Sequence, residues 1–282
     1  MTTKSSPTRA HEHVLEIAAT PEVVWKTITE AEELVRWFPL GASVKPGKGG
    51  EILYRWGELE GRCRILAWQP PRHLRTGWME APTPDAKAPD FPRSTPADEP
   101  ARAALAVDWH LEAKGGSTVL RVVHSGFSPG AQWDKEYDGT NRGWTFELQA
   151  LKHYLEHQRG KERRATWARQ GTTLTPAAVW ERFAKPGGVF REVALGSLGA
   201  GDRYRFVRAD GEVFEGRVLV NHAPLEFAGT LASHGDGMIR FGFEDCMGGP
   251  EAHVWLATWG HSAAEFSGIE SGWRKSLASA FG

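Results

Sequence analysis

The sequence predicts an α+β protein in which an antiparallel sheet packs against one long helix, and it predicts this arrangement twice. Residues 143–158 carry apolar side chains at the spacing of one helix face, and after Gly143 the segment contains no glycine or proline. Short segments that alternate apolar and polar side chains precede this helix, as strands with one buried face do. The second half repeats the motifs of the first, and a length of 282 residues suits two domains.

The first half of the chain is expected to contain six strands and two short helices before the long helix. Thr20-Pro21-Glu22 predicts a helix start, because threonine caps a helix, proline suits its first turn and glutamate complements its dipole. Residues 30–38 predict a second short helix, and residues 125–142 are expected to form a loop. Strands are expected at residues 13–18, 50–56, 60–68, 72–79, 103–113 and 118–124.

Residues 81–102 differ in composition from their surroundings. They are rich in proline, aspartate and alanine, which suits neither a helix nor a central strand. Long loops of this kind are either disordered or functional. Disorder is the preferred interpretation, and the alternative is a lid over a pocket with Phe91 as its one large apolar contact.

The second half begins again at about residue 164. Thr175-Pro176 repeats Thr20-Pro21, and a Glu-Gly-Arg triplet recurs in the same order. Matching order over many elements indicates a tandem duplication. Strands are expected at residues 165–171, 204–207, 213–220, 225–230, 238–245 and 253–259.

The last helix of the second half is expected to be short, because apolar spacing is clear only after Gly272. The second domain is therefore predicted to be the less stable one. Trp144→Ala is expected to cost the first domain about 3–5 kcal/mol, and Trp273→Ala is expected to cost the second domain less.

Composition and net charge argue against several classes of protein. A net charge of −1 argues against a nucleic-acid partner, which needs a basic excess. No apolar run approaches the roughly 20 residues that a membrane-spanning helix needs, so no membrane span is expected. Residues 1–13 contain no secretory apolar segment, and Cys63 and Cys246 are too few for a disulfide framework. The chain is expected to be cytoplasmic.

Four motifs in order resemble the activator of Hsp90 ATPase homologue branch of the START/Bet v 1-like (SRPBCC) superfamily: TPEVVW, LVRWFPL, VVHSGF and GWTFELQALKHYLE. The resemblance implies the helix-grip fold, a curved antiparallel sheet around a long C-terminal helix. It implies a first domain at 11–160, with the insertion at 81–102, and a more divergent second domain at 164–282. Members of this superfamily often hold hydrophobic ligands between sheet and helix.

A hydrophobic pocket of this kind would be lined by inward-facing aromatic and aliphatic side chains of the first domain. Simple core packing is the alternative for each of them, since large apolar side chains are usually buried. The candidate ligand-binding residues are Trp37, Phe38, Tyr54, Trp56, Trp78, Trp109, His124, Phe127, Trp144, Leu148 and Leu151.

Signals of catalysis or metal binding are poor. His124 is interpreted as a hydrogen-bonded core histidine rather than a proton-transfer group. His11 and His13, near the start of the chain, are weak evidence for a metal because no further ligand is evident. Glu244 and Asp245 are neighbours on a strand and point to opposite faces. No catalytic residue, metal site or cofactor is therefore predicted.

Three functions remain open. The preferred one is non-catalytic binding of a hydrophobic small molecule. The resemblance also implies a chaperone partner, namely Hsp90, although no counterpart of the activators' separate docking module is recognised in the sequence. The third is an enzyme resembling a polyketide cyclase or hydrolase, which would need converging polar groups inside the pocket.

Overall fold

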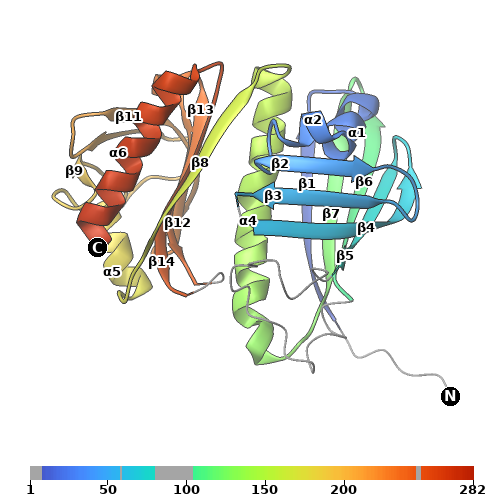
Figure 1. The fold of residues 1–282 in the computed structure, drawn as a ribbon, viewed down its shortest axis with the longest axis horizontal. Coiled ribbons are helices and arrows are strands. Elements are labelled where there is room, and N and C mark those ends of the chain that lie inside the picture. The colour runs from blue at the N-terminus through green and yellow to red at the C-terminus, as the bar shows by residue number, and fades with distance from the viewer. Residues whose placement is uncertain (1–7, 58, 80–103, 246–248) are drawn as a thin grey trace. The chain divides into compact units, whose positions relative to one another are not determined.

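The computed structural model describes residues 8–57, 59–79, 104–245 and 249–282, and the chain divides into two compact units, 1–159 and 160–282. Each unit has one seven-stranded antiparallel sheet and one long helix packed on it (Figure 1). That the ranges 11–160 and 164–282 fold as independent domains stays a prediction. The insertion at 81–102, Phe91 and Cys246 lie outside the described residues.

Unit 1 places two short helices after its first strand and its long helix after its last strand. Its elements are β1 (Arg9–Ile17), α1 (Pro21–Thr29), α2 (Ala31–Leu34), β2 (Gly41–Lys45), β3 (Glu51–Trp56), β4 (Leu59–Gln69), β5 (His73–Met79), β6 (Ala106–Lys114), β7 (Ser117–Phe127), η1 (Ala131–Trp133), α4 (Asp134–His153) and a π-helical end, η2 (Tyr154–Gln158).

Unit 2 follows the same plan with one short helix. Its elements are β8 (Arg163–Gly171), α5 (Pro176–Ala184), β9 (Phe190–Glu192), β10 (Arg203–Arg208), β11 (Val213–His222), β12 (Glu226–Leu231), η3 (Ala232–His234), β13 (Gly237–Glu244), β14 (Glu251–Trp259) and α6 (Ala263–Phe281).

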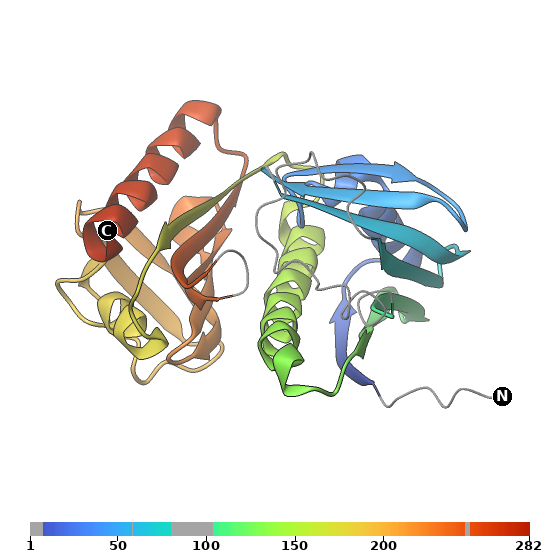
Figure 2. The same cartoon turned by 60° about the horizontal axis from the view of Figure 1, so that its bottom comes forward.

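The two sheets have the same topology. The strand order in unit 1 is β1-β7-β6-β5-β4-β3-β2, and the order in unit 2 is β8-β14-β13-β12-β11-β10-β9, so each strand has a counterpart seven places later. α4 packs on one face of the first sheet and α6 on one face of the second (Figure 2). The predicted α+β helix-grip fold and its tandem duplication are therefore confirmed.

The long helix of unit 1 starts earlier than the sequence predicted. Residues 134–142, expected as loop, form the first turns of α4. These turns carry polar residues and Gly139, so they lack a continuous apolar stripe. They are anchored instead by Tyr137, whose ring lies 5.3 Å from the Phe127 ring, and by buried Trp133 just before them.

The prediction of a short final helix was wrong. α6 contains 19 residues and begins with a capping box, in which Ser262 and Glu265 bond each other's backbone N–H groups. Its buried side chains recur at helical spacing: Phe266, Ile269, Trp273, Leu277 and Phe281. Gly268 and Gly272 hid the first half of this helix, since glycine weakens a helical pattern.

Two edge strands were not predicted at all. β2 has five residues and β9 has three, too few to show a clear alternation. The second predicted helix is also shorter than residues 30–38, because α2 ends at Leu34. None of the helices in the described ranges is long and apolar enough to cross a membrane.

Candidate functional site

Strand register brings the predicted site residues of unit 1 onto the sheet face that packs against α4. Leu74 pairs with Trp109, and Val107 pairs with His124, so these side chains share one face. The ring of Trp109 lies 5.3 Å from the ring of Trp144 on α4. This face therefore holds the aromatic interior of the unit.

Five of the eleven predicted residues are fully packed core residues. They are at most 5% exposed: Trp37, Trp109, Phe127, Leu148 and Leu151. Trp37 also donates its Nε1–H to the carbonyl oxygen of Thr27 at 3.0 Å, which satisfies the one polar atom of its ring. These side chains stabilise the fold and leave no surface for a ligand.

Five others form a contiguous group that keeps part of its surface accessible. This accessible aromatic cluster consists of Phe38, Tyr54, Trp56, His124 and Trp144. Phe38 is its centre, because its ring lies 5.3 Å from Tyr54, 5.3 Å from Trp56 and 6.2 Å from Trp144.

Trp78, the remaining predicted residue, lies at the margin of this cluster. It is 37% exposed, and its ring packs closely over Gly61, the register partner of Tyr54. A Cβ at Gly61 would lie 2.9 Å from the Trp78 ring and 3.4 Å from the Trp56 ring. The inward position expected for Trp78 is thus only partly realised.

His124 and Trp144 join sheet and helix through a hydrogen bond. Trp144 donates Nε1–H to Nδ1 of His124 at 3.0 Å, so the histidine proton resides on Nε2. Burial, together with a smaller contribution from His11 nearby, lowers the pKa of His124 to about 3. The ring is therefore neutral at physiological pH, as expected for a hydrogen-bonded core histidine and not for a proton-transfer group.

Tyr54 and Cys63 offer two more polar atoms on the same face. Burial raises the pKa of the Tyr54 hydroxyl, which has no hydrogen-bond partner in the part of the chain that the structure describes. Burial also raises the pKa of the Cys63 thiol to about 12, so this cysteine is not a nucleophile at neutral pH.

Sequence reasoning missed the part that His11 and His13 take in this interior. It began the first strand at His13 and left His11 outside it, but both belong to β1, where His11 pairs with His124 and His13 with Val122. The His11 ring lies 3.8 Å from the Tyr137 ring, and burial lowers the pKa of both histidines. His11 and His13 lie two residues apart with Glu12 between them, and this alternation was the signal that could have extended the predicted strand to His11.

Lowering the pH from about 7 to about 5 is expected to destabilise unit 1 through His124. The unfolded chain takes up a proton near the ordinary histidine pKa of about 6.5, whereas folded His124 stays neutral until about pH 3. The stability is present above the unfolded pKa and is lost as the pH falls towards 3, by at most about 1.4 kcal/mol per pH unit per proton.

Urea midpoints of wild type and His124→Gln at the two pH values measure this effect. The variant is expected to lose less stability, although His11 and His13 act in the same direction and remain. Equal losses in both proteins would contradict the role assigned to His124.

The interior of unit 2 differs from that of unit 1. Its inner aromatic residues are fully buried and stack on one another, with Phe227 5.0 Å from Phe241 and Phe206 5.1 Å from Phe227. Trp273, the counterpart of Trp144, is 0% exposed. Accessible interior aromatic surface of the kind seen around Phe38 therefore marks unit 1 as the candidate binding unit.

Comparisons with known proteins found one family model and several solved structures that are similar to parts of this chain. A family model described as "Activator of Hsp90 ATPase homolog 1-like protein" matches residues 18–156. No curated protein matches the chain. Solved structures that resemble it include an Aha1 dimer from Colwellia psychrerythraea, at 18% identity and a TM-score of 0.44, which covers 54% of this chain and 99% of its own.

Two further solved structures are similar to different extents of the chain. Protein MLL2253 from Mesorhizobium loti has 22% identity and a TM-score of 0.43, and the match covers 54% of this chain and 99% of that one. DynU16, titled a putative protein in the dynemicin biosynthetic locus, has 14% identity and a TM-score of 0.40 over 95% of this chain and 96% of its own. Residues 18–156, which make up most of unit 1, match the model of the Activator of Hsp90 ATPase homolog 1-like family, and unit 2 repeats the sheet topology of unit 1.

Proposed function

We propose that unit 1 binds a hydrophobic small molecule against the accessible aromatic cluster between its sheet and α4. The observation that carries this proposal is that the rings of Phe38, Tyr54, Trp56 and Trp144 contact one another beneath α4 and still keep accessible surface. Side chains that are surrounded by protein but incompletely packed are what an internal hollow requires.

The chemistry of the cluster favours a flat, mostly apolar ligand. Phe38, Trp56 and Trp144 offer ring faces, against which an aromatic ligand gains both apolar burial and favourable ring geometry. The Tyr54 hydroxyl and the Nε2–H of His124 add two polar atoms that can orient such a ligand. No cationic side chain belongs to the cluster, which argues against a strongly anionic ligand.

Phe38→Ala is expected to weaken binding of the uncharged hydrophobic probe Nile red about tenfold, since tenfold corresponds to about 1.4 kcal/mol, the contribution of one aromatic contact. Fluorescence titration of the purified full chain measures it. Leu66→Ala is the matched control, because Leu66 is 40% exposed on β4 and lies outside the cluster.

If Phe38→Ala leaves saturable binding unchanged, or if Leu66→Ala weakens it as much as Phe38→Ala does, the probe binds outside the accessible aromatic cluster. Native mass spectrometry of the protein as purified provides an independent test. A co-purified apolar molecule that is lost in Phe38→Ala is the expected result, and an absence of any saturable binding would overturn the proposal.

Binding is preferred over catalysis for a specific reason. His11, His13 and His124 do converge on the inner face, as an enzyme would need. However, the lowered pKa of His124 makes it a weak general base at neutral pH, and its Nδ1 is occupied by Trp144. A cyclase or hydrolase activity remains the alternative, to be tested with polyketide-like substrates.

A chaperone partner is the other alternative, and the family name is its only support. It makes a separable prediction, since stimulation of Hsp90 ATPase activity would not depend on a ligand in the interior. An ATPase assay with wild type and Phe38→Ala distinguishes the two: equal stimulation by both proteins would favour the chaperone role.

A further inference from the structure

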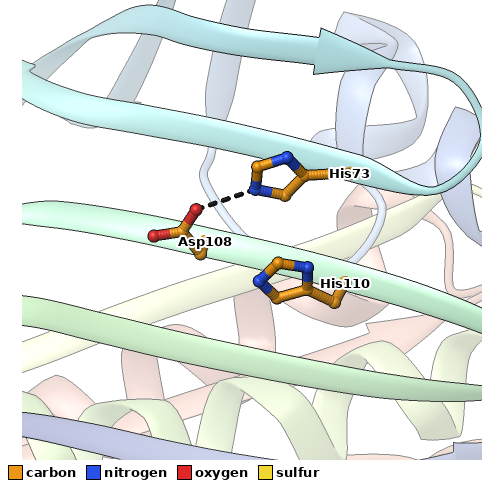
Figure 3. A group of neighbouring side chains, drawn as sticks. All are labelled: His73, Asp108 and His110. Carbon is orange, nitrogen blue, oxygen red and sulfur yellow. Dashed lines mark hydrogen bonds and ion pairs between the residues drawn. The ribbon is translucent and has the colours of Figure 1, made fainter.

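A second group of polar side chains lies on the opposite face of the unit 1 sheet. Asp108 and His110 flank Trp109 on β6 and therefore point away from the aromatic interior. His73 on β5 pairs directly with His110, and Arg75 pairs with Asp108. Antiparallel register thus brings two imidazoles and one carboxylate together on neighbouring strands (Figure 3).

The three side chains are close and mutually oriented. Nε2 of His73 lies 2.8 Å from Oδ1 of Asp108, and the two histidine rings stack with centroids 4.5 Å apart and planes 4° apart. One ligand atom of each residue lies within 4.8 Å of the others. In Figure 3 both rings direct a nitrogen towards the side on which the carboxylate lies.

We propose that His73, Asp108 and His110 bind one divalent transition-metal ion of the zinc class. Two imidazole nitrogens and one carboxylate oxygen are a common ligand set for such ions. Three protein ligands leave at least one coordination position for water or for a further ligand.

The observed spacing needs little change to accept the ion. Zinc–ligand distances of about 2.0–2.2 Å in tetrahedral geometry place ligand atoms roughly 3.3–3.5 Å apart. The 2.8 Å between Nε2 of His73 and Oδ1 of Asp108 would have to widen, and the longer separations, of at most 4.8 Å, would have to shorten. Both changes are within reach of side-chain rotation. The strand backbones are fixed by the ladder between β5 and β6 and between β6 and β7.

One neighbouring arginine, Arg75, supports Asp108, and the other, Arg121, is engaged elsewhere. Arg75 donates to Oδ2 of Asp108 at 2.8 Å, which leaves Oδ1 on the side of the histidines. Such an outer partner orients a ligand carboxylate, as in known metal sites. Arg121, opposite His110 in register, is paired with Glu12 at 2.8 Å.

Metal binding requires one change in protonation, at His73. An ionised carboxylate can only accept, so Nε2 of His73 carries a proton that it donates to Asp108 in the metal-free protein. Binding of the metal must displace the His73 proton, or shift it to Nδ1, before Nε2 can coordinate.

Calorimetric titration of the full chain with Zn²⁺ tests the proposal. Wild type is expected to bind one equivalent, and His110→Ala at least about tenfold more weakly, since loss of even an outer partner costs 10–100-fold. His110 is chosen because it does not share the His73–Asp108 hydrogen bond, so the variant should fold. His222→Ala is the control, because His222 is an exposed strand histidine of unit 2.

A second measurement is a thermal melt with and without Zn²⁺. The metal is expected to raise the melting temperature of wild type and of His222→Ala, and not that of His110→Ala. Absence of stoichiometric binding to wild type, or unchanged affinity in a folded His110→Ala or His110→Gln variant, would overturn the site.

Discussion

Trp273→Ala is expected to destabilise unit 2 by about 3–5 kcal/mol, the range for truncating a fully buried aromatic side chain. Trp273 is 0% exposed, and its ring lies 4.8 Å from Phe214 and 5.9 Å from Phe190. The Arg208 guanidinium sits over it, 5.0 Å from the ring centroid. Truncation would leave a cavity and also remove a cation–π contact from a buried charge.

The same change at the counterpart position, Trp144→Ala, is expected to cost less. Part of the Trp144 ring is accessible, so truncation removes fewer contacts, together with one hydrogen bond to His124. This order reverses the one predicted from sequence, which rested on a short final helix. α6 is in fact 19 residues long.

Urea unfolding of both variants, with amide hydrogen exchange resolved to α4 and α6, measures each unit separately. Faster exchange in α6 of Trp273→Ala than in α4 of Trp144→Ala, each relative to wild type, is the expected pattern. A larger loss for Trp144→Ala would show that the accessible surface of its ring does not reflect looser packing.

The strands and the central part of α4 were predictable because they rest on patterns that are local in sequence, and the family resemblance supplied the helix-grip arrangement. Strand alternation marks which residues share a face, and the central part of α4 carries a clear apolar stripe. The duplication was predictable because motif order repeats. The helix starts at Asp134 and Ala263 were not predictable, because glycine and polar residues interrupt the apolar stripe in the first turns of both helices. In these turns the packing partners come from strands that are distant in sequence.

The candidate sites were less predictable because they depend on three-dimensional contacts. Sequence placed eleven side chains in one interior, but only packing divides Trp109, which is core, from Phe38 and Trp144, which keep accessible surface. The metal-ligand group was invisible for another reason. His73 and His110 become neighbours only through the register of β5 with β6, strands that residues 80–105 separate in sequence.

A Gly-Trp pair recurs in the two long helices, but packing requires the glycine in only one of them. Gly143 has no atom within 4 Å of a would-be Cβ, so nothing nearby requires glycine there. A Cβ at Gly272 would lie 2.6 Å from Cζ of Arg208, whose side chain is only 2% exposed. Arg208 is held in place by ion pairs with Asp210, at 2.7 Å, and with Glu212.

Gly272→Ala is therefore expected to destabilise unit 2 by about 2–4 kcal/mol, because overpacking forces a buried, paired guanidinium to move. Gly268→Ala is the matched control in the same helix, where no atom lies within 4 Å. There the gain in helix propensity is expected to stabilise by about 0.5–1 kcal/mol. Both variants make the same chemical change in α6, so the difference between their urea midpoints isolates the contact with Arg208. Equal shifts in the two variants would mean that Arg208 can leave its position freely, and the ion pairs with Asp210 and Glu212 would then contribute little to unit 2.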